Sequence, residues 1–222
     1  NVLRQPQHPS GGERNSRRTV HVTSCDNRNI HQVVKEIAEA PVDTAGLTSM
    51  TIRTNDFSSV EIDCFADVTF HQQKDLGAPM VRLMARSEVL EHVSTKTADD
   101  VLNISTDRRY RMPEKAVIVI DVYAPYVNKF MLNGVKCLRL GNMILNSSVF
   151  LELNGVGALM SQSLTAHEVS VRLVGSGSID LKGVKTGRLA AEIYGSGNIY
   201  LQGTCREKIF REKGTGLIIY NP

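Results

Sequence analysis

A glycine-centred phrase recurs about every twenty residues through the second half of the chain. The five glycines are Gly134, Gly155, Gly175, Gly195 and Gly214, at spacings of 21, 20, 20 and 19 residues. The phrases around them read NGVKCLRL, NGVGALMS, GSGSIDL, GSGNIYL and GTGLIIY. Such a repeat constrains the fold strongly, because each unit must bury its apolar face against the units next to it.

Alignment of the phrases on their glycines places apolar residues in common columns, four and two residues before the glycine and four residues after it. Apolar alternation at a period of two predicts two short strands per repeat, one on each side of the glycine. The columns are Phe130, Leu151, Val171, Ala191 and Phe210; Leu132, Leu153, Leu173 and Ile193, with Glu212 interrupting; and Leu138, Leu159, Ile179, Ile199 and Ile218.

The column three residues before the glycine alternates in charge after its first member. It holds Met131, Glu152, Arg172, Glu192 and Arg211. If the repeats stack as parallel strands about 4.8 Å apart, each charge lies beside an opposite one. Asparagine also recurs in one column, at 133 and 154, as a side-chain amide ladder would require. Both columns predict an in-register parallel stack.

The fold class predicted from this repeat is all-β, a parallel β-solenoid with coils of about 20 residues. Leucine-rich repeats share the period, but their helix and LxxLxL phrase are absent, and a propeller blade is about twice as long. Earlier segments also alternate, and Val60, Val81 and Leu102 continue a spacing of 21. The strand system is therefore expected to run from about Thr51 to the C-terminus, which gives a β-helix domain over 51–222.

The N-terminal region, 1–50, differs from the rest. Residues 1–18 are polar and rich in Pro, Gly and Arg, which predicts a disordered or loosely docked arm. Residues 29–40, NIHQVVKEIAEA, place apolar residues at helical spacing. This pattern predicts a short amphipathic helix that caps the open end of the solenoid core.

Composition excludes several function classes. The formal net charge is only +3 with mixed signs, aromatic residues make up 5% and Trp is absent, so nothing favours nucleic-acid binding. The four cysteines and six histidines show no metal-binding spacing, so neither a metal nor another cofactor is predicted. No run of about 18 apolar residues exists, so no transmembrane segment is expected.

The phrases VGSGSIDLKG and YGSGNIYLQG could suggest a phosphate-binding loop, because glycine amides can surround an anion. Strand-like residues follow both loops, however, where a phosphate loop needs a helix N-terminus. We therefore interpret Gly175 and Gly195 as tight corners at which glycine supplies a positive φ angle.

The candidate binding residues form two predicted surface patches. The first comprises the outward columns through Arg172, Asp180 and Tyr200. The second is the predicted loop TDRRYRMPEK, in which Arg108 and Arg109 flank Tyr110 and could meet an acidic glycan or lipid headgroup. A solvated loop is the simpler interpretation of the second patch.

The same outward columns raise the question of catalysis, since polysaccharide lyases and glycosidases on β-helices use clustered carboxylates. Here Arg172 separates Glu152 from Glu192, and Asp180 lies in another column. An ion-pair ladder explains these acids better, so no catalytic residue is assigned.

The order of FSSVEIDCFADVTFHQ, VLNIST, VIVIDVYAP and serial Gly-Ser-Gly phrases resembles the bacterial head GIN domain family of auto-transporter adhesins, over roughly residues 52–220. This resemblance implies a right-handed parallel β-helix, an exported or cell-surface location in Gram-negative bacteria, and no established catalytic residues. The chain departs from the family in its long N-terminal segment and in the Asn-Gly-Val phrases of its first two coils.

The function expected from the residues and the resemblance together is that of an exported, non-enzymatic β-helical module for adhesion or for binding surface glycans or proteins. No export signal is visible in the chain itself. Two alternatives stay open. One is a carbohydrate-active enzyme on the same scaffold, and the other is a purely structural domain that associates with itself through an exposed terminal coil.

Overall fold

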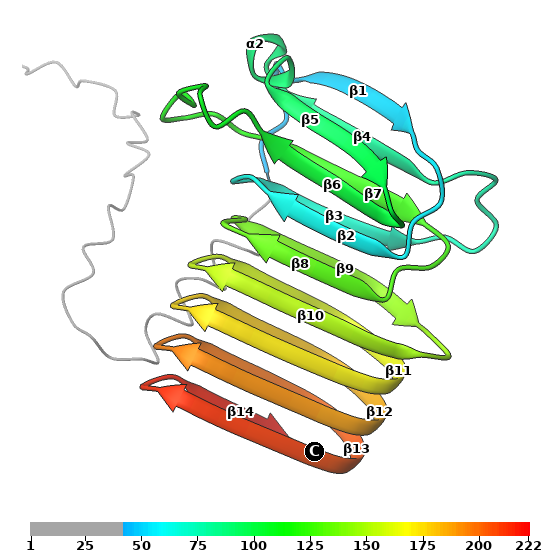
Figure 1. Cartoon of the computed structure of the whole chain (residues 1–222), viewed down its shortest axis with the longest axis vertical. Helices are drawn as coiled ribbons and strands as arrows, with labels where there is room; N and C mark the ends of the chain where they lie inside the picture. Colours follow the sequence, from blue (N-terminus) through cyan, green and yellow to red (C-terminus); the bar gives the residue numbers. More distant parts are fainter. Residues whose placement is uncertain (1–41) are drawn as a thin grey trace, which may run out of the picture.

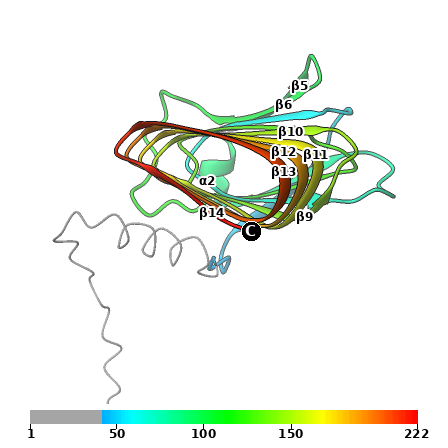
Figure 2. The same cartoon turned by 90° about the horizontal axis from the view of Figure 1, so that it is seen from below.

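Stacked β-strands make up most of the chain in the computed structural model, which describes residues 42–222 (Figure 1). The predicted arm over 1–18 and the predicted helix over 29–40 lie outside the described residues. Within 42–222 the only helix is α2, Ser87–Leu90. The coils form a flattened ring when seen along the stack (Figure 2). The predicted β-solenoid is confirmed.

Each coil contributes one strand to each of the two long sides of the ring. The strands before the glycine corner form the upstream sheet, with β6 (Val101–Thr106), β2 (Ser59–Asp63), β8 (Lys129–Asn133) and β10 (Ser148–Gly155) in this order. The strands after the corner form the downstream sheet, with β7 (Val119–Ala124), β3 (Asp67–Gln72) and β9 (Cys137–Ile144).

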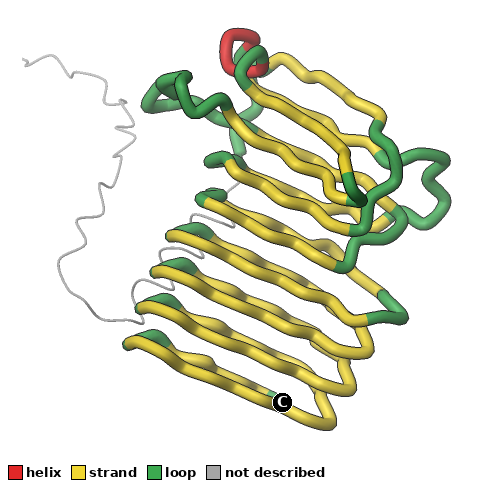
Figure 3. The backbone as a smooth tube through the Cα atoms, viewed as in Figure 1, coloured by secondary structure: helices red, strands yellow, loops and turns green. Residues whose placement is uncertain are grey.

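Three long strands bend around the far edge of the ring and belong to both sheets. They are β11 (Ala158–Gly175), β12 (Ser178–Gly195) and β13 (Asn198–Gly214), and β14 (Leu217–Asn221) completes the last coil. In β11, Ala158 pairs with Cys137 of the downstream sheet and Val171 pairs with Leu151 of the upstream sheet. The strand therefore connects one coil to the next without a loop (Figure 3).

The predicted register is confirmed. Leu153 pairs with Leu132 and Leu173, and Leu159 pairs with Leu138 and Ile179. The side-chain amide of Asn154 donates to Asn133 Oδ1 at 2.9 Å. The apolar columns form the core between the two sheets, where the most buried residues include Leu151, Leu153, Leu159, Leu173, Ile179, Leu181 and Ile199, all at 0% exposure.

The charge ladder is present at two of its steps. Arg172 Nη1 lies 3.7 Å from Glu152 Oε2, and Arg211 Nη1 lies 2.9 Å from Glu192 Oε1. Arg172 is also in register with Glu192, but its guanidinium group lies over the ring of Tyr194 instead, with its carbon 5.0 Å from the ring centre. Because the side chains of Arg172 and Arg211 are 42% and 66% exposed, these ion pairs contribute little stability, and the ladder mainly records the register.

The first coils are not stacked in chain order, which corrects the expectation drawn from Val60, Val81 and Leu102. Val60 pairs in parallel with both Leu102 and Phe130, so the coil of β2 and β3 lies between two coils that come later in the chain. Val81 belongs to β4 (Met80–Ala85), which is antiparallel to its neighbours and pairs with Val122. The spacing of 21 therefore does not mark three successive coils.

Antiparallel strands and α2 lie at the N-terminal end of the stack. β1 (Thr48–Arg53) pairs with β4 at the edge of the downstream sheet, and β5 (Val93–Ala98) pairs with β6 at the edge of the upstream sheet. Val89 and Leu90 of α2 are buried. Antiparallel strand pairing therefore ends the parallel stack at this end of the molecule (Figure 1).

The glycine corners are confirmed. Gly175 has φ +122°, and the amide of Ser176 donates to the carbonyl oxygen of Gly155 in the preceding coil at 3.0 Å. Gly177 is needed for a different reason, because a Cβ there would lie 2.7 Å from the carbonyl oxygen of Gly157. One glycine of the phrase thus turns the chain, and the other allows the coils to approach closely.

Candidate functional site

A hollow of about 410 Å³ lies on the outer face of the downstream sheet, and we call it the Gly141 hollow. Strands β3, β9, β11 and β12 form it. Two adjacent outward columns of the stack provide its lining. The lining residues are Thr69, Arg139, Met160 and Asp180 from one column, His71, Gly141, Gln162 and Lys182 from the other, and Leu140 and Ser161 between them.

The absence of a side chain at Gly141 opens the hollow at its centre. Gly141 directly follows Leu140, which pairs with Phe70 of β3 and Ser161 of β11. A Cβ at this position would meet only the carbonyl oxygen of Phe70, at an ordinary contact distance of 3.6 Å. The backbone therefore does not require glycine here, and a larger side chain would fill the space.

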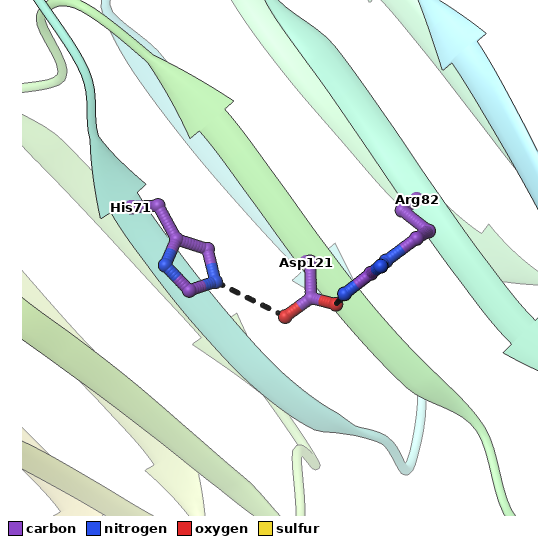
Figure 4. A network of polar contacts seen from close by, with 3 residues as sticks. All are labelled: His71, Arg82 and Asp121. Atoms are coloured by element: carbon purple, nitrogen blue, oxygen red, sulfur yellow. Dashed lines mark hydrogen bonds and ion pairs between the residues drawn. The ribbon is translucent and has the colours of Figure 1, made fainter. Parts of the chain in front are cut away.

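His71 is held at one edge of the hollow by a polar network (Figure 4). Its Nε2 lies 3.1 Å from Asp121 Oδ1, and its ring stacks on Tyr123 with ring centres 4.5 Å apart. The second oxygen of Asp121 accepts hydrogen bonds from Arg82 Nε and Nη2 at 3.1 and 2.7 Å. These bonds and the negative charge of Asp121 raise the pKa of Arg82.

Arg139 is fixed by a second buried carboxylate. Asp67 is only 3% exposed, and its two oxygens lie 2.6 Å from Lys136 Nζ and 3.3 Å from Arg139 Nη2. Two cations around one buried carboxylate leave a net positive charge at this side of the hollow. The position of the Arg139 side chain is therefore fixed by its contact with Asp67.

Asp180 and Lys182 are the charged residues in the hollow whose side chains remain available to a ligand. Whereas His71 and Arg139 are bonded to Asp121 and Asp67, neither Asp180 nor Lys182 forms an ion pair with any residue in 42–222. Their side chains are two residues apart on one face of β12. They present a hydrogen-bond acceptor and a donor of opposite charge side by side.

Tyr200 extends this surface by one coil, since it pairs with Asp180 across β12 and β13. Burial raises the pKa of Tyr200, and the negative charge of Asp180 adds to the increase, although a hydrogen bond with Asn198 lowers it. Asp180, Tyr200 and Gln202 also border a second hollow of about 260 Å³. Asp180 is therefore shared between two adjoining depressions.

The predicted site residues fall in three places. Asp180 and Tyr200 are neighbours on the downstream sheet, but Arg172 lies on the upstream sheet beside Glu152. Arg108, Arg109 and Tyr110 lie in the loop after β6, where Arg108 Nη2 lies 3.1 Å from Asp63 Oδ2. The ring of Tyr110 stacks on that of His92, with centres 3.6 Å apart.

Gly141, Arg139 and Lys182 were not predicted as site residues, although the repeat contains a signal for them. Arg139 and Asp180 are both five residues after a repeat glycine, and Gly141 and Lys182 are both seven residues after one. Extending the alignment by three positions would have placed these residues in adjacent outward columns. No comparable signal exists for His71, whose strand β3 precedes the glycine repeat.

Metal-binding side chains and thiols are the other groups in the described residues that could carry chemistry. No group of three or more His, Cys, Asp or Glu side chains that could hold a metal ion occurs in the described part of the chain. Cys64, Cys137 and Cys205 carry free thiols, and burial raises the pKa of Cys64 to about 12 and of Cys137 to about 11. No helix in 42–222 is long and apolar enough to cross a membrane.

Residues 56–218 match the family model described as "Putative auto-transporter adhesin, head GIN domain". Among solved structures, a "putative adhesin" from Bacteroides fragilis is 17% identical with a TM-score of 0.60, covering 79% of this chain and 97% of its own. A "putative lipid binding protein" from Parabacteroides distasonis is 13% identical with a TM-score of 0.43, covering 80% and 98%. A "putative cell adhesion protein" from Clostridium sporogenes is 10% identical with a TM-score of 0.39, covering 79% and 99%. No curated protein matches the chain.

Proposed function

The chain belongs to the head GIN domain family, and we propose that it is an exported, non-enzymatic β-solenoid that binds a glycan or protein at a cell surface through the outer face of its downstream sheet. The family description, as an auto-transporter adhesin, supports a role in surface contact. The B. fragilis structure supports only the fold, because its identity to this chain is 17%.

The proposal rests on Asp180 and Lys182 in the Gly141 hollow, two charged side chains that form no ion pair with any residue in 42–222. A carboxylate accepts hydrogen bonds from sugar hydroxyls, and an ammonium group donates to hydroxyl or carboxylate oxygens. Asp180 projects from a strand position that is paired on both sides, with Met160 and Tyr200, so little backbone ordering opposes binding there. Lys182 lies at the bulge where the register of β12 and β13 shifts. Met160, which lies between Arg139 and Asp180 in the same outward column, provides an apolar surface beside them.

Binding is a better account of the hollow than glycoside hydrolysis. Hydrolysis in most glycosidase families needs two carboxyl groups that flank the scissile bond. Among residues 42–222, Asp180 is the only carboxylate that lines the Gly141 hollow, and the nearby Asp67 and Asp121 are engaged with basic side chains. A ligand held here therefore meets an acceptor and donors but no second carboxyl group.

The loop residues Arg108, Arg109 and Tyr110 are proposed as a subsidiary contact for acidic groups. The side chain of Arg108 is 89% exposed even though it pairs with Asp63. The guanidinium group therefore still has donors directed to solvent. This contact would lie near the N-terminal end of the stack and not in the Gly141 hollow.

An array of neutral and acidic glycans and matrix proteins tests the proposed function. We expect the 222-residue chain to bind a subset of the array, and both Gly141→Leu, which fills the hollow, and Asp180→Asn/Lys182→Gln to lower this binding at least tenfold. The control is Glu168→Gln/Arg188→Gln, which removes an acid and a base that lie 3.8 Å apart on the upstream sheet. It should bind like the unmodified chain.

Three outcomes would contradict the proposal. They are an array on which nothing binds, equal losses in the hollow variants and the control, and turnover of a glycan that disappears in Asp180→Asn. The last result would favour the enzymatic alternative. A loss confined to Arg108→Glu/Arg109→Glu would place the binding site in the loop after β6.

A further inference from the structure

The last coil of the solenoid has a different interior from the coils before it. In the inward columns of the upstream sheet, Lys208 pairs with the buried Leu189, and Glu212 pairs with the buried Ile193. Both charged residues are exposed. Charges in these columns would be costly beneath a coil that carried only apolar residues there, so the residues themselves indicate that the run of apolar coils ends at this coil.

The two charges are accommodated within the coil. Lys208 Nζ lies 4.9 Å from the ring centre of Tyr220, and Glu212 Oε1 accepts a hydrogen bond from the amide of Ile218 at 2.7 Å. The hydroxyl group of Tyr220 donates to the carbonyl oxygen of Gly203 at 2.7 Å. These contacts close the end of the core with polar groups.

The upstream half of β13, residues 204–214, nevertheless remains an open strand edge. It pairs with β12 on one side, and no strand within 42–222 pairs with its other side. A row of unpaired backbone groups is a template for another strand. Its outward residues are Glu207, Ile209, Arg211 and Lys213, and Ile209 lies at its centre.

We propose that residues 204–214 of β13 pair antiparallel with the same strand of a second copy of this chain, around a two-fold axis at Ile209. Such an axis gives an isologous contact in which each pair occurs twice. Glu207 of one copy then faces Arg211 of the other on the outer surface. Arg206 faces Glu212 on the inner surface, so all four cross-strand charge pairs are favourable.

The alternative registers are less favourable. An axis at Lys208 would place this residue opposite its own copy, and an axis at Arg211 would do the same for that residue. An axis at Phe210 also pairs opposite charges, but it leaves Thr204 and Cys205 without partners, whereas the Ile209 register uses the whole strand. Charge complementarity and overlap together favour the Ile209 register.

The dimer would place both copies of the Gly141 hollow on the same side. A two-fold axis perpendicular to the sheets reverses the stack and the strands but leaves the outer face of each downstream sheet pointing in the same direction. Two sites on one rigid body can engage a surface together, which raises avidity without a new contact. The dimer itself does not depend on the proposed binding function.

Light scattering coupled to size-exclusion chromatography tests the dimer. The unmodified 222-residue chain should show a concentration-dependent mass that rises to twice the monomer mass of 24.5 kDa. Glu207→Arg and Arg211→Glu should each raise the dissociation constant about tenfold, because each places like charges opposite one another. An equimolar mixture of the two variants should regain the dimer, since the two basic side chains of one variant would then face the two acidic side chains of the other.

The double variant Glu207→Arg/Arg211→Glu separates this effect from stability. Within one chain, Arg211 pairs with Glu192 at 2.9 Å and Glu207 with Arg188 at 4.0 Å, and the double variant loses both pairs. We expect its melting temperature to stay lowered while its dimer is restored. A stability effect alone would not restore the dimer.

Crosslinking identifies the register. In a Cys25→Ser/Cys205→Ser background, Ile209→Cys should form a disulfide with its own copy under mild oxidation, because directly opposite residues of antiparallel strands lie about 4.5 to 5.5 Å apart. Lys213→Cys should not form a disulfide with its own copy, because it would lie opposite residue 205 of the second copy. A chain that remains monomeric at all concentrations, or charge reversals that leave the mass unchanged, would overturn the proposal.

Discussion

The two glycines of the Gly-Ser-Gly phrase at 175–177 have different physical roles in this protein. Gly175 adopts a φ of +122°, where side chains with a Cβ are strained, and its position also lies against the carbonyl group of Gly155. Gly177 has no positive φ in this range, but it allows the backbone of Gly157 to approach. A phosphate loop would use the same residue types, but here strands follow the corner and the amides bond to the preceding coil.

Gly175→Ala tests this account at a single residue. A Cβ at Gly175 would lie 2.5 Å from the carbonyl oxygen of Gly155, so both strain and a clash oppose it. We expect a loss of about 2 kcal/mol or more in the free energy of unfolding, measured by urea titration. The control is Gly77→Ala, where nothing lies within 4 Å of the added atom, and it should change the stability by less than about 0.5 kcal/mol. Equal effects would contradict the corner interpretation.

The buried thiols give a second prediction at the residue scale. Burial raises the pKa of Cys64 to about 12 and of Cys137 to about 11 from an ordinary value of 9.0, so both are neutral thiols in the folded protein at pH 8. Since the thiolate is the reactive form, iodoacetamide should label neither residue until the chain unfolds. Because their folded pKa values are raised, the stability they contribute is complete below pH 9 and declines as the pH rises towards 11 to 12.

Mass spectrometry after labelling at about pH 8, with and without about 8 M urea, measures the effect. Cys205 provides the internal comparison, because it is only partly buried. Rapid labelling of Cys64 or Cys137 in the folded protein would show that the core between the sheets opens on the time scale of the reaction.

At the scale of elements, the repeat predicted the register of five coils but not the order of all of them. The columns through Leu153 and Leu159 follow from the spacing of the glycines, because neighbouring coils are also neighbours in the chain. The alternation in β2 and β4 predicted strands, but alternation says nothing about the partner or its direction. The position of β2 between β6 and β8 depends on contacts between residues far apart in sequence, such as Val60 with Phe130.

Asp67 connects the displaced coil of β3 to the next coil, and its removal tests this connection. Its carboxylate bonds to Lys136 and Arg139 from a site that is 3% exposed. Asp67→Asn should therefore lower the free energy of unfolding by about 2 kcal/mol, since hydrogen bonds between charged groups contribute about 1.5 to 3 kcal/mol each and the amide retains part of them.

Asp63→Asn is the matched control for this measurement. Asp63 pairs with Arg108 at 3.1 Å, but both side chains are far more exposed than Asp67. Exposed pairs contribute about 0 to 1 kcal/mol, so this substitution should have little effect. If the two variants unfold at the same urea concentration, Asp67 does not connect the coils in the way described.

At the scale of the whole molecule, the candidate site arises from the order of the coils. The Gly141 hollow combines β9 and β12, which the repeat places in register, with β3, which only the folded structure brings beside β9. Asp180 and Tyr200 were accessible to sequence analysis because they belong to the repeat. His71 and its network with Asp121 and Arg82 were not, because they come from strands outside it (Figure 4).

The flattened shape of the stack also separates the predicted residues. Arg172 and Asp180 are only eight residues apart in sequence, but a corner lies between them and directs them to opposite outer faces. Adhesion through the outer face of the downstream sheet would leave the outer face of the upstream sheet, with its ladder of Glu152 and Arg172, without a ligand.

Hydrogen exchange with the strongest ligand from the array tests the central claim most directly, because it locates the ligand on the solenoid. Amides of β9 and of the downstream segments of β11 and β12, residues 137–144, 158–165 and 178–185, should exchange more slowly when the ligand is bound. Residues 148–155 and 168–175 of the upstream sheet should not change, and Gly141→Leu should abolish the effect. Protection that is confined to the upstream sheet, or that persists in Gly141→Leu, would contradict the assignment of the binding face.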